Sequence, residues 1–310
     1  MFNVFIDGRE GTTGLQIYER LSKRGDINLI TIPEELRKDV SARKERLNAA
    51  DICFLCLPDA AARESVSLIE NPSVRVIDAS TAHRTADGWV YGLPELSAER
   101  REAVARSPRV ANPGCHATGF ITLVAPLVKG GILGAGYPLT AHSVTGYSGG
   151  GKKMIAEYEA DGRSVLLSSP RQYSLSLSHK HLPEMVKECA LDHAPIFNPI
   201  VGDFYCGMCV TVPLYKSLLL KKMGVDDIRN YFAEYYASQN FVKVAKKEEI
   251  PAYLPANELA GTNLLKIYVS GNDDMILMCS VFYNLGKGAS GAAVQNMNIM
   301  LGLDETFSLV

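Results

Sequence analysis

Short apolar runs recur through the first third of the chain, separated by polar or amphipathic stretches. Apolar and β-branched residues fill positions 2–6, 27–32, 51–57, 74–80 and 108–112, a pattern that predicts buried β-strands. Helical spacing follows the first run at 15–21, and polar or helical stretches surround 34–48, 59–70 and 95–106. Near-continuous apolar strands that alternate with helices are typical of a parallel sheet covered on both faces. We therefore expect an α/β, Rossmann-like domain at the start of the chain.

The pattern changes after residue 116. A helical run at 117–129 precedes longer extended segments rich in Val, Thr and Tyr, at 139–147, 199–215, 264–270 and 275–283. One further helix is predicted at 225–238, and the C-terminal stretch is again helical. This mixture predicts an α+β domain with a mixed sheet, one face of which is open to a partner or cofactor. A chain of 310 residues exceeds the usual size of one core, so two domains fit its length.

Composition narrows the class of protein. Hydrophobic residues make up 47% and charged residues 21%, with a net charge of -2, as in an ordinary soluble globular protein. Without a basic surplus, nucleic acid is not expected as a partner. No apolar run reaches membrane-spanning length, and the first lacks the basic flank of a secretory signal, so we expect a cytoplasmic protein with no membrane partner. The seven cysteines predict reduced thiols, and the C-x-x-C pairs at 53/56 and 206/209 lie in apolar runs that favour core packing over zinc or redox roles.

A glycine-rich turn separates the first strand from the first helix. Gly8, Gly11 and Gly14 occupy "DGREGTTG", where a dinucleotide pyrophosphate would meet the helix N-terminus. Gly8 permits a tight turn, Gly11 lets phosphate approach the backbone, and Gly14 lets helix and strand pack closely. The spacing differs from the commoner G-x-G-x-x-G, and a plain glycine turn is the alternative.

The second strand bears on the choice of dinucleotide. Sites that prefer NAD usually place an acid at its end to bind the ribose 2′-hydroxyl. This strand ends at Thr31-Ile32, and acidic and basic residues follow together at 34–38. Arg9 in the glycine turn is able to reach a 2′-phosphate, so the residues favour NADP.

The clearest chemical signal is Cys115 in "RVANPGCHATG". A strand ends, Asn112-Pro113-Gly114 turns, and the thiol stands at the start of the next helix. The positive end of a helix favours thiolate, and its unpaired N–H groups stabilise an oxyanion formed beside the sulfur. We therefore interpret Cys115 as a nucleophile, with a buried inert cysteine as the alternative.

A nucleophilic thiol needs a proton acceptor, which here would be histidine. In "SLSHKHLPEM" an extended backbone would turn His179 and His181 to one face and Lys180 to the other, so that one imidazole serves the chemistry and the other binds substrate. No third ligand supports a metal site. The remaining histidines are His83, His116, His142 and His193, of which the last two are expected to be structural or exposed.

A second glycine run, "TGYSGGGKKM", precedes another helix. Ser148, Gly149 and Gly150 would present N–H groups suited to an anion, although a surface loop is the alternative. The full phosphate-loop spacing is absent, which disfavours a nucleoside triphosphate.

Taken in order, "DGREGTTG", "DAST", "YGLPEL", "NPGCHATG", "GYSGGGK", "SHKHLPEM" and "NLGKGASGAAVQN" give the chain a specific resemblance. The sequence resembles, over nearly its whole length, the shorter form of N-acetyl-gamma-glutamyl-phosphate reductase, an enzyme family of arginine biosynthesis. The resemblance implies NADP(H)-dependent reduction of an acyl phosphate to an aldehyde through a Cys115 thioester, with release of inorganic phosphate. It also implies a fold similar to glyceraldehyde-3-phosphate and aspartate-semialdehyde dehydrogenases.

The same resemblance implies the domain limits and the residue roles. Residues 1–115 with 285–310 would form the dinucleotide-binding domain, and 116–284 the catalytic and oligomerisation domain of a homodimer or homotetramer. Cys115 would be the nucleophile, His179 and His181 the acid–base and substrate-orienting pair, Arg84 the phosphate anchor and Asn284 a nicotinamide contact. Many relatives carry Tyr-Pro after the cysteine, where this chain has His116-Ala117. The expected substrate residues are Arg84, Ser148, Gly149 and Gly150, and the expected cofactor residues are Gly8, Arg9, Gly11, Thr12, Thr13, Gly14, Ser80 and Asn284.

Three alternatives remain at this stage. Aspartyl phosphate or an aminoadipate-type acyl phosphate could replace the N-acetylglutamyl substrate. A dinucleotide-binding redox sensor would need no thioester. A cysteine hydrolase would leave the first glycine turn unexplained.

Overall fold

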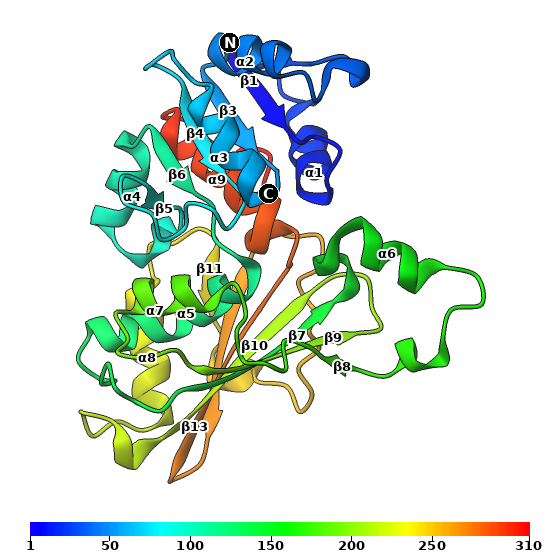
Figure 1. Cartoon of the computed structure of the whole chain (residues 1–310). Helices are drawn as coiled ribbons and strands as arrows, with labels where there is room; N and C mark the ends of the chain where they lie inside the picture. Colours follow the sequence, from blue (N-terminus) through cyan, green and yellow to red (C-terminus); the bar gives the residue numbers. More distant parts are fainter. The chain divides into compact units, whose positions relative to one another are not determined.

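The chain is described over all of residues 1–310 in a computed structural model (Figure 1). It divides into two compact units. Unit 1 contains Met1–Pro113 and Ala289–Val310, and unit 2 contains Gly114–Gly288. Each unit has its own sheet.

The sheet of unit 1 has six strands in the order β2-β1-β3-β4-β6-β5, and all of its pairs are parallel. Strand β2 is added on one side of β1, and β3 and the later strands are added on the other side. This reversal creates a switch point between β1 and β3. Ligands of such sheets bind at the carboxyl ends of the strands beside that point. The strands are β1 Phe2–Asp7, β2 Ile27–Ile30, β3 Ile52–Leu55, β4 Arg75–Asp78, β5 Val90–Tyr91 and β6 Arg109–Ala111.

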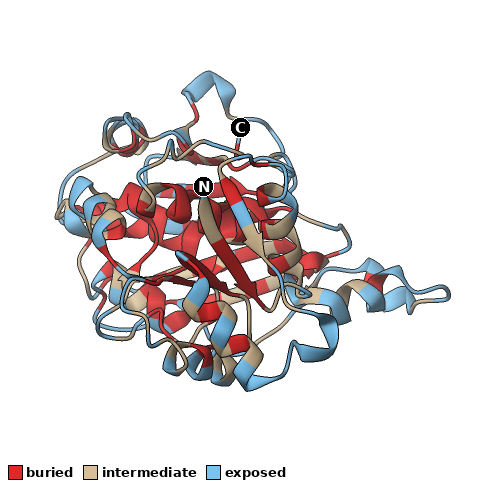
Figure 2. Cartoon of the chain, turned by 90° about the horizontal axis from the view of Figure 1, so that it is seen from above, coloured by how far each residue is buried: buried red, intermediate tan, exposed pale blue.

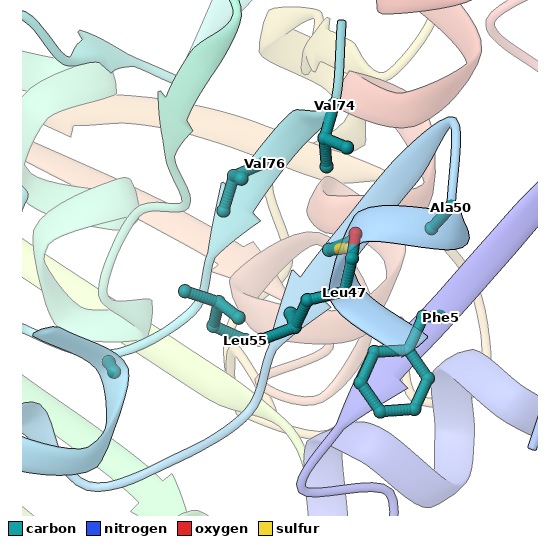
Figure 3. Close-up of a cluster of buried hydrophobic side chains, with 8 residues drawn as sticks. Phe5, Leu47, Ala50, Leu55, Val74 and Val76 are labelled. Carbon is teal, nitrogen blue, oxygen red and sulfur yellow. The ribbon is translucent and has the colours of Figure 1, made fainter. Parts of the chain in front are cut away.

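The helices of unit 1 are α1 Thr12–Leu21, α2 Val40–Ala49, α3 Asp59–Ser67, α4 Ala98–Arg106 and α9 Gly291–Met300. Helix α9 comes from the C-terminal segment and contacts α1, α4 and β4. One part of the core, drawn in Figure 3, joins Phe5 of β1 and Leu47 of α2 to Leu55 and to Val74 and Val76 at β4. These side chains are fully or almost fully buried, and each such burial contributes about 1.5–3 kcal/mol.

Unit 2 contains a seven-stranded mixed sheet in the order β11-β12-β13-β10-β7-β9-β8. Its centre is antiparallel, with β13 between β12 and β10. Strands β7 and β9 are parallel. The strands are β7 Thr140–Gly146, β8 Arg171–Gln172, β9 Ile196–Gly202, β10 Met208–Tyr215, β11 Val242–Val244, β12 Leu265–Gly271 and β13 Met275–Phe282.

The two faces of this sheet differ. Helices of unit 2 cover one face, where α5 packs on β10 and β13 and α8 packs on β12. On the other face Pro213 and Tyr215 of β10 lie directly across from Leu277 and Met275 of β13, and all four side chains are exposed. Figure 2 shows buried residues concentrated in strands and inner helices. The helices are α5 Cys115–Lys129, α6 Gly151–Glu159, α7 Leu182–Cys189 and α8 Val225–Tyr235.

The expected fold class is confirmed, with a parallel Rossmann-like sheet and a second, mixed sheet. The polar or helical stretch expected around 34–48 contains a 3₁₀ turn at Glu34–Leu36 and helix α2. Helix α7 is an element that the sequence pattern did not predict. One local expectation needs correction. His179 and His181 lie in a turn instead of an extended segment, because the Leu182 N–H donates to the His179 carbonyl (3.0 Å). No helix has both the length and the apolarity to cross a membrane.

Candidate active site

The glycine turn of unit 1 is shaped by its own backbone. Gly8 has φ +85°, and a Cβ there would lie 2.4 Å from the Cys56 carbonyl oxygen. A Cβ at Gly14 would lie 2.6 Å from the Gly8 carbonyl oxygen. Both positions therefore require glycine, while Gly11 forms the N-cap of α1 without a side-chain cap. The start of α1 presents backbone N–H groups as a phosphate site requires.

A cavity of about 360 Å³ opens beside this turn. It is lined by Gly8, Arg9 and Gly11, by Cys56 after β3, and by the residues that end β2. The cavity thus lies at the switch point of the parallel sheet, the expected place for a dinucleotide. Thr12 and Thr13 are half-buried at the start of α1 and do not line it.

Basic side chains also line this cavity, and they differ in whether they form ion pairs. Arg9 pairs with Glu10 (3.2 Å) and Arg37 with Glu34 (3.5 Å). Lys38 also lines the cavity, is exposed, and forms no ion pair. A 2′-phosphate entering this cavity would therefore meet an uncompensated cation at Lys38.

Ser80 lies in the turn that follows β4. Its backbone N–H and hydroxyl both donate to the Asp78 carboxylate, at 2.9 and 2.8 Å. The His83 Nδ1 is 2.6 Å from the same carboxylate, and its ring stacks on Trp89 with centroids 4.2 Å apart. The buried Asp78 carboxylate therefore holds this turn through its hydrogen bonds with Ser80 and His83.

Arg84, the expected phosphate anchor, is 9% exposed. Its Nε donates to the Asn112 carbonyl (3.0 Å) and its Nη2 to the Ala79 carbonyl (3.2 Å). These bonds join the turn after β4 to the end of β6. They hold the plane of the guanidinium in one orientation.

Cys115 is the first residue of α5, and its side chain is partly exposed. The preceding Gly114 is the N-cap, and its N–H donates to the buried Glu184 carboxylate at 3.0 Å. A Cβ at Gly288 would lie 3.0 Å from the Cys115 Cβ, so the chain also passes closely on that side. The thiol therefore stands at a helix start whose position is fixed by two other segments of unit 2.

Two expected histidines gather before α7. The rings of His179 and His181 meet edge to face, with centroids 4.7 Å apart, and the His181 N–H donates to the His179 Nδ1 (3.1 Å). The turn thus brings both imidazoles together, as an extended segment would also have done. No group of three or more His, Cys, Asp or Glu side chains is placed to hold a metal ion.

His116 completes this group and was not assigned a role from the sequence. Its ring lies 5.4 Å from that of His179 and 5.6 Å from that of His181. Its Nδ1 is 2.6 Å from the Ser143 hydroxyl and its Nε2 is 2.7 Å from the Tyr173 hydroxyl. Burial, reinforced by the charges of His179 and Lys180, lowers the pKa of His116 to about 3. His116 is therefore a neutral imidazole near pH 7.

This burial predicts acid sensitivity. His116 takes up its proton near pH 6.5 when unfolded but only near pH 3 when folded, so the unfolded chain binds more protons between these values. Stability should fall as pH drops through that window, by about 1.4 kcal/mol per unit from this residue. Urea unfolding at pH 4 and pH 7 should show a smaller loss for His116→Gln than for the wild type. Equal losses in both proteins would contradict the buried neutral state.

Asn284 is 1% exposed, and both polar atoms of its side chain are used within unit 2. Its Oδ1 accepts from the Gly207 N–H (2.8 Å) and its Nδ2 donates to the Ser148 hydroxyl (3.0 Å). Ser148 is buried, while Gly149 and Gly150 are exposed at the end of the 3₁₀ turn Tyr147–Gly150. Through these two hydrogen bonds Asn284 links Ser148 of the second glycine run to Gly207 in the turn before β10.

Comparisons with known proteins agree with this geometry. Residues 115–284 match the semialdehyde dehydrogenase dimerisation domain, and residues 31–104 match the semialdehyde dehydrogenase NAD binding domain. N-acetyl-gamma-glutamyl-phosphate reductase 2 from Nostoc sp. is 45% identical over 99% of this chain and 98% of its own length. The reductase from Chelativorans sp. is 49% identical over 96% of this chain and 97% of its own.

The chain belongs to the N-acetyl-gamma-glutamyl-phosphate reductase family.

Solved structures of lower identity share the fold of this reductase family member. Aspartate semialdehyde dehydrogenase from Francisella tularensis aligns with a TM-score of 0.73 at 16% identity, over 97% of this chain and 100% of that chain. The enzyme from Candida albicans, solved with NADP, aligns with a TM-score of 0.69 at 14% identity, over 97% and 98%. The expected similarity to aspartate-semialdehyde dehydrogenases is confirmed for the fold.

Membership of the reductase family confirms the resemblance found in the sequence and makes the chain an oxidoreductase with a dinucleotide-binding domain. The roles of individual residues stay predictions. The sequence pointed to Cys115, His179 and His181, and unit 2 brings the two histidines together. The sequence contained no signal for the contact between His116 and Tyr173 or for the bond between Gly114 and Glu184.

Proposed function

We propose that this protein reduces N-acetyl-gamma-glutamyl phosphate to N-acetylglutamate semialdehyde and inorganic phosphate, with NADPH as reductant and a thioester on Cys115 as intermediate. The names of relatives at 45–49% identity support the substrate. The observation that carries the proposal is the thiol at the first residue of α5, next in the chain to a histidine that clusters with two others.

The residues of unit 1 fit an NADP(H) molecule. Gly8 and Gly14 let the turn pack closely against the Cys56 carbonyl and against itself. The start of α1 then presents backbone N–H groups to a phosphate. The cavity beside the turn accepts the adenosine part, with Lys38 and Arg9 as partners for the 2′-phosphate. When bound, the cofactor supplies a hydride. Faster turnover with NADP than with NAD is the expected preference.

Cys115 performs the covalent chemistry in this proposal. His179 or His181 accepts the thiol proton, and the thiolate attacks the acyl-phosphate carbon. N–H groups at the start of α5 stabilise the oxyanion, and phosphate leaves with the electron pair of the broken C–O bond. Arg84 is the proposed anchor for the phosphate group, its guanidinium held by two backbone carbonyls.

A second phase releases the aldehyde. A bound cofactor would supply the hydride that converts the thioester to a hemithioacetal oxyanion on Cys115. The same N–H groups or a histidine proton would stabilise that oxyanion. When the C–S bond breaks, the electron pair returns to sulfur and the aldehyde forms. The neutral His116 takes no part in these proton transfers, which leaves His179 and His181.

The decisive assay runs the reaction in reverse. N-acetylglutamate semialdehyde, inorganic phosphate and NADP are expected to give phosphate-dependent absorbance of reduced cofactor at 340 nm. Aspartate semialdehyde and aminoadipate semialdehyde serve as comparison substrates. Faster oxidation of either would replace the proposed substrate, and no turnover with any of them would favour a non-catalytic dinucleotide sensor.

We also infer that the open face of the unit 2 sheet packs against a second copy. Exposed Pro213, Tyr215, Met275 and Leu277 gather there, and Ile196 of β9 is 56% exposed. Exposed apolar patches of this kind mark interaction sites. The mass in solution is expected to be a multiple of 33.8 kDa, as a homodimer or homotetramer, and a monomer would contradict the inference.

A further inference from the structure

Tyr173 contacts His116, the chain neighbour of the proposed nucleophile, although no sequence motif pointed to it. It directly follows β8, and its hydroxyl is 2.7 Å from the His116 Nε2. The neighbouring residue of His116 is Cys115, and a thiolate there adds to burial in raising the pKa of the Tyr173 phenol. The phenol therefore stays protonated within electrostatic range of the sulfur.

The protons of this network can be assigned. Neutral His116 has one N–H donor and one acceptor nitrogen. The hydroxyl of fully buried Ser143 has no hydrogen-bond partner besides the His116 Nδ1. If Nδ1 carried the proton, the Ser143 proton would be buried without an acceptor, which is costly. Ser143 therefore donates to Nδ1, and the Nε2–H of His116 donates to the Tyr173 oxygen.

This tautomer decides what Tyr173 can do. Its oxygen already accepts from His116, so its own proton is not used in that bond. Tyr173 forms no other side-chain hydrogen bond. The one strong donor of the phenol is thus left for a group at the Cys115 side.

We propose that the Tyr173 hydroxyl donates a hydrogen bond to the Cys115 thiolate, and that Ser143 and His116 are positioning residues that aim it. The inference rests on the proposed function, because it takes the Cys115 sulfur to be the nucleophile. Tyr173 keeps its proton throughout, and the thiol proton goes to His179 or His181 as before. A charge-assisted bond of this kind favours the anion that attacks the acyl phosphate.

Other polar and titratable groups lie around the start of α5, so the test must isolate Tyr173. On α5 the adjacent side chain is His116. The turn before α7 contributes His179, Lys180 and His181, and the Glu184 carboxylate of α7 accepts the Gly114 N–H. Lys287 is fully buried next to Gly288, which approaches the Cys115 Cβ. None of these side chains is changed when Tyr173 loses only its hydroxyl oxygen.

The experiment follows alkylation of Cys115 by iodoacetamide against pH, with the modified peptide quantified by mass spectrometry. In the full-length Tyr173→Phe protein, the pH midpoint of alkylation is expected to rise by about one unit. The kcat/KM for phosphate-dependent oxidation at pH 7 should fall about tenfold and recover partly at higher pH. Tyr231→Phe is the matched control, because its hydroxyl bonds the Pro126 carbonyl near the other end of α5 (2.8 Å), and its midpoint should match that of the wild type.

Each result separates the two proposals. An unchanged midpoint in Tyr173→Phe, with Cys115 still reactive in the wild type, would overturn the role of Tyr173 and leave the nucleophile in place. A wild-type protein in which Cys115 resists alkylation and Cys115→Ser retains turnover would instead overturn the proposed function. His116→Phe removes the aiming contact and should move the midpoint in the same direction as Tyr173→Phe, whereas an opposite shift would contradict the positioning role.

Discussion

Replacing Cys115 by serine is expected to lower phosphate-dependent turnover by about 10⁴-fold or more, because a neutral hydroxyl does not replace a thiolate as nucleophile. The change removes no packing volume of consequence at the first residue of α5. The variant should therefore fold and bind NADP(H) as the wild type does. Turnover by the coupled absorbance assay and cofactor binding by calorimetry measure the two expectations.

Cys206→Ser is the matched control for this variant. Cys206 is also a partly exposed thiol of unit 2, but burial raises its pKa, so it stays protonated. Its replacement should leave the kcat/KM within about twofold of the wild type. Mass spectrometry of the quenched reaction should detect an acyl group on Cys115 and none on Cys206. Substantial turnover by Cys115→Ser would refute the covalent mechanism.

Much of unit 1 could be predicted because its strands and its glycine turn are marked by residues that are close together in the sequence. Apolar runs marked the strands, and a glycine turn between strand and helix marked the dinucleotide site. Gly8 illustrates the reason, since a positive φ and a close backbone contact leave a trace in the residue type itself. The resemblance extended this to the family, which the comparisons confirmed.

The unit 2 site was less accessible because it depends on contacts between distant segments. His116 and Tyr173 are separated by 57 positions, and nothing in either local sequence links them. Asn284 reaches Ser148 across 136 positions. One local signal did mark the turn at 179–181. Pro183 is a residue that favours the first turn of a helix, so it indicates that a helix begins directly after His181.

Gly8→Ala should remove most cofactor binding. An alanine at φ +85° is strained, and its Cβ would lie 2.4 Å from a backbone oxygen that cannot move without shifting the end of β3. The turn must open, which withdraws backbone N–H groups from the phosphates. Losing one or two charge-assisted bonds of about 1.5–3 kcal/mol each corresponds to roughly 100-fold weaker NADP(H) binding. Calorimetric titration of the variant measures this directly.

The Gly88→Ala variant separates the effect of backbone strain at positive φ from the effect of a steric clash of the added Cβ. Gly88 has a similar φ of +79°, yet a Cβ there meets nothing within 4 Å. This control should lose about 1–2 kcal/mol of stability, as expected for alanine in the left-handed region, and keep normal cofactor affinity. If Gly8→Ala bound NADP(H) as tightly as Gly88→Ala, the glycine turn would not be the phosphate site, and the dinucleotide would have to be held elsewhere in unit 1. Weak binding in Gly8→Ala alone, with a cooperative urea unfolding transition that shows the variant to be folded, would assign the loss to the turn itself.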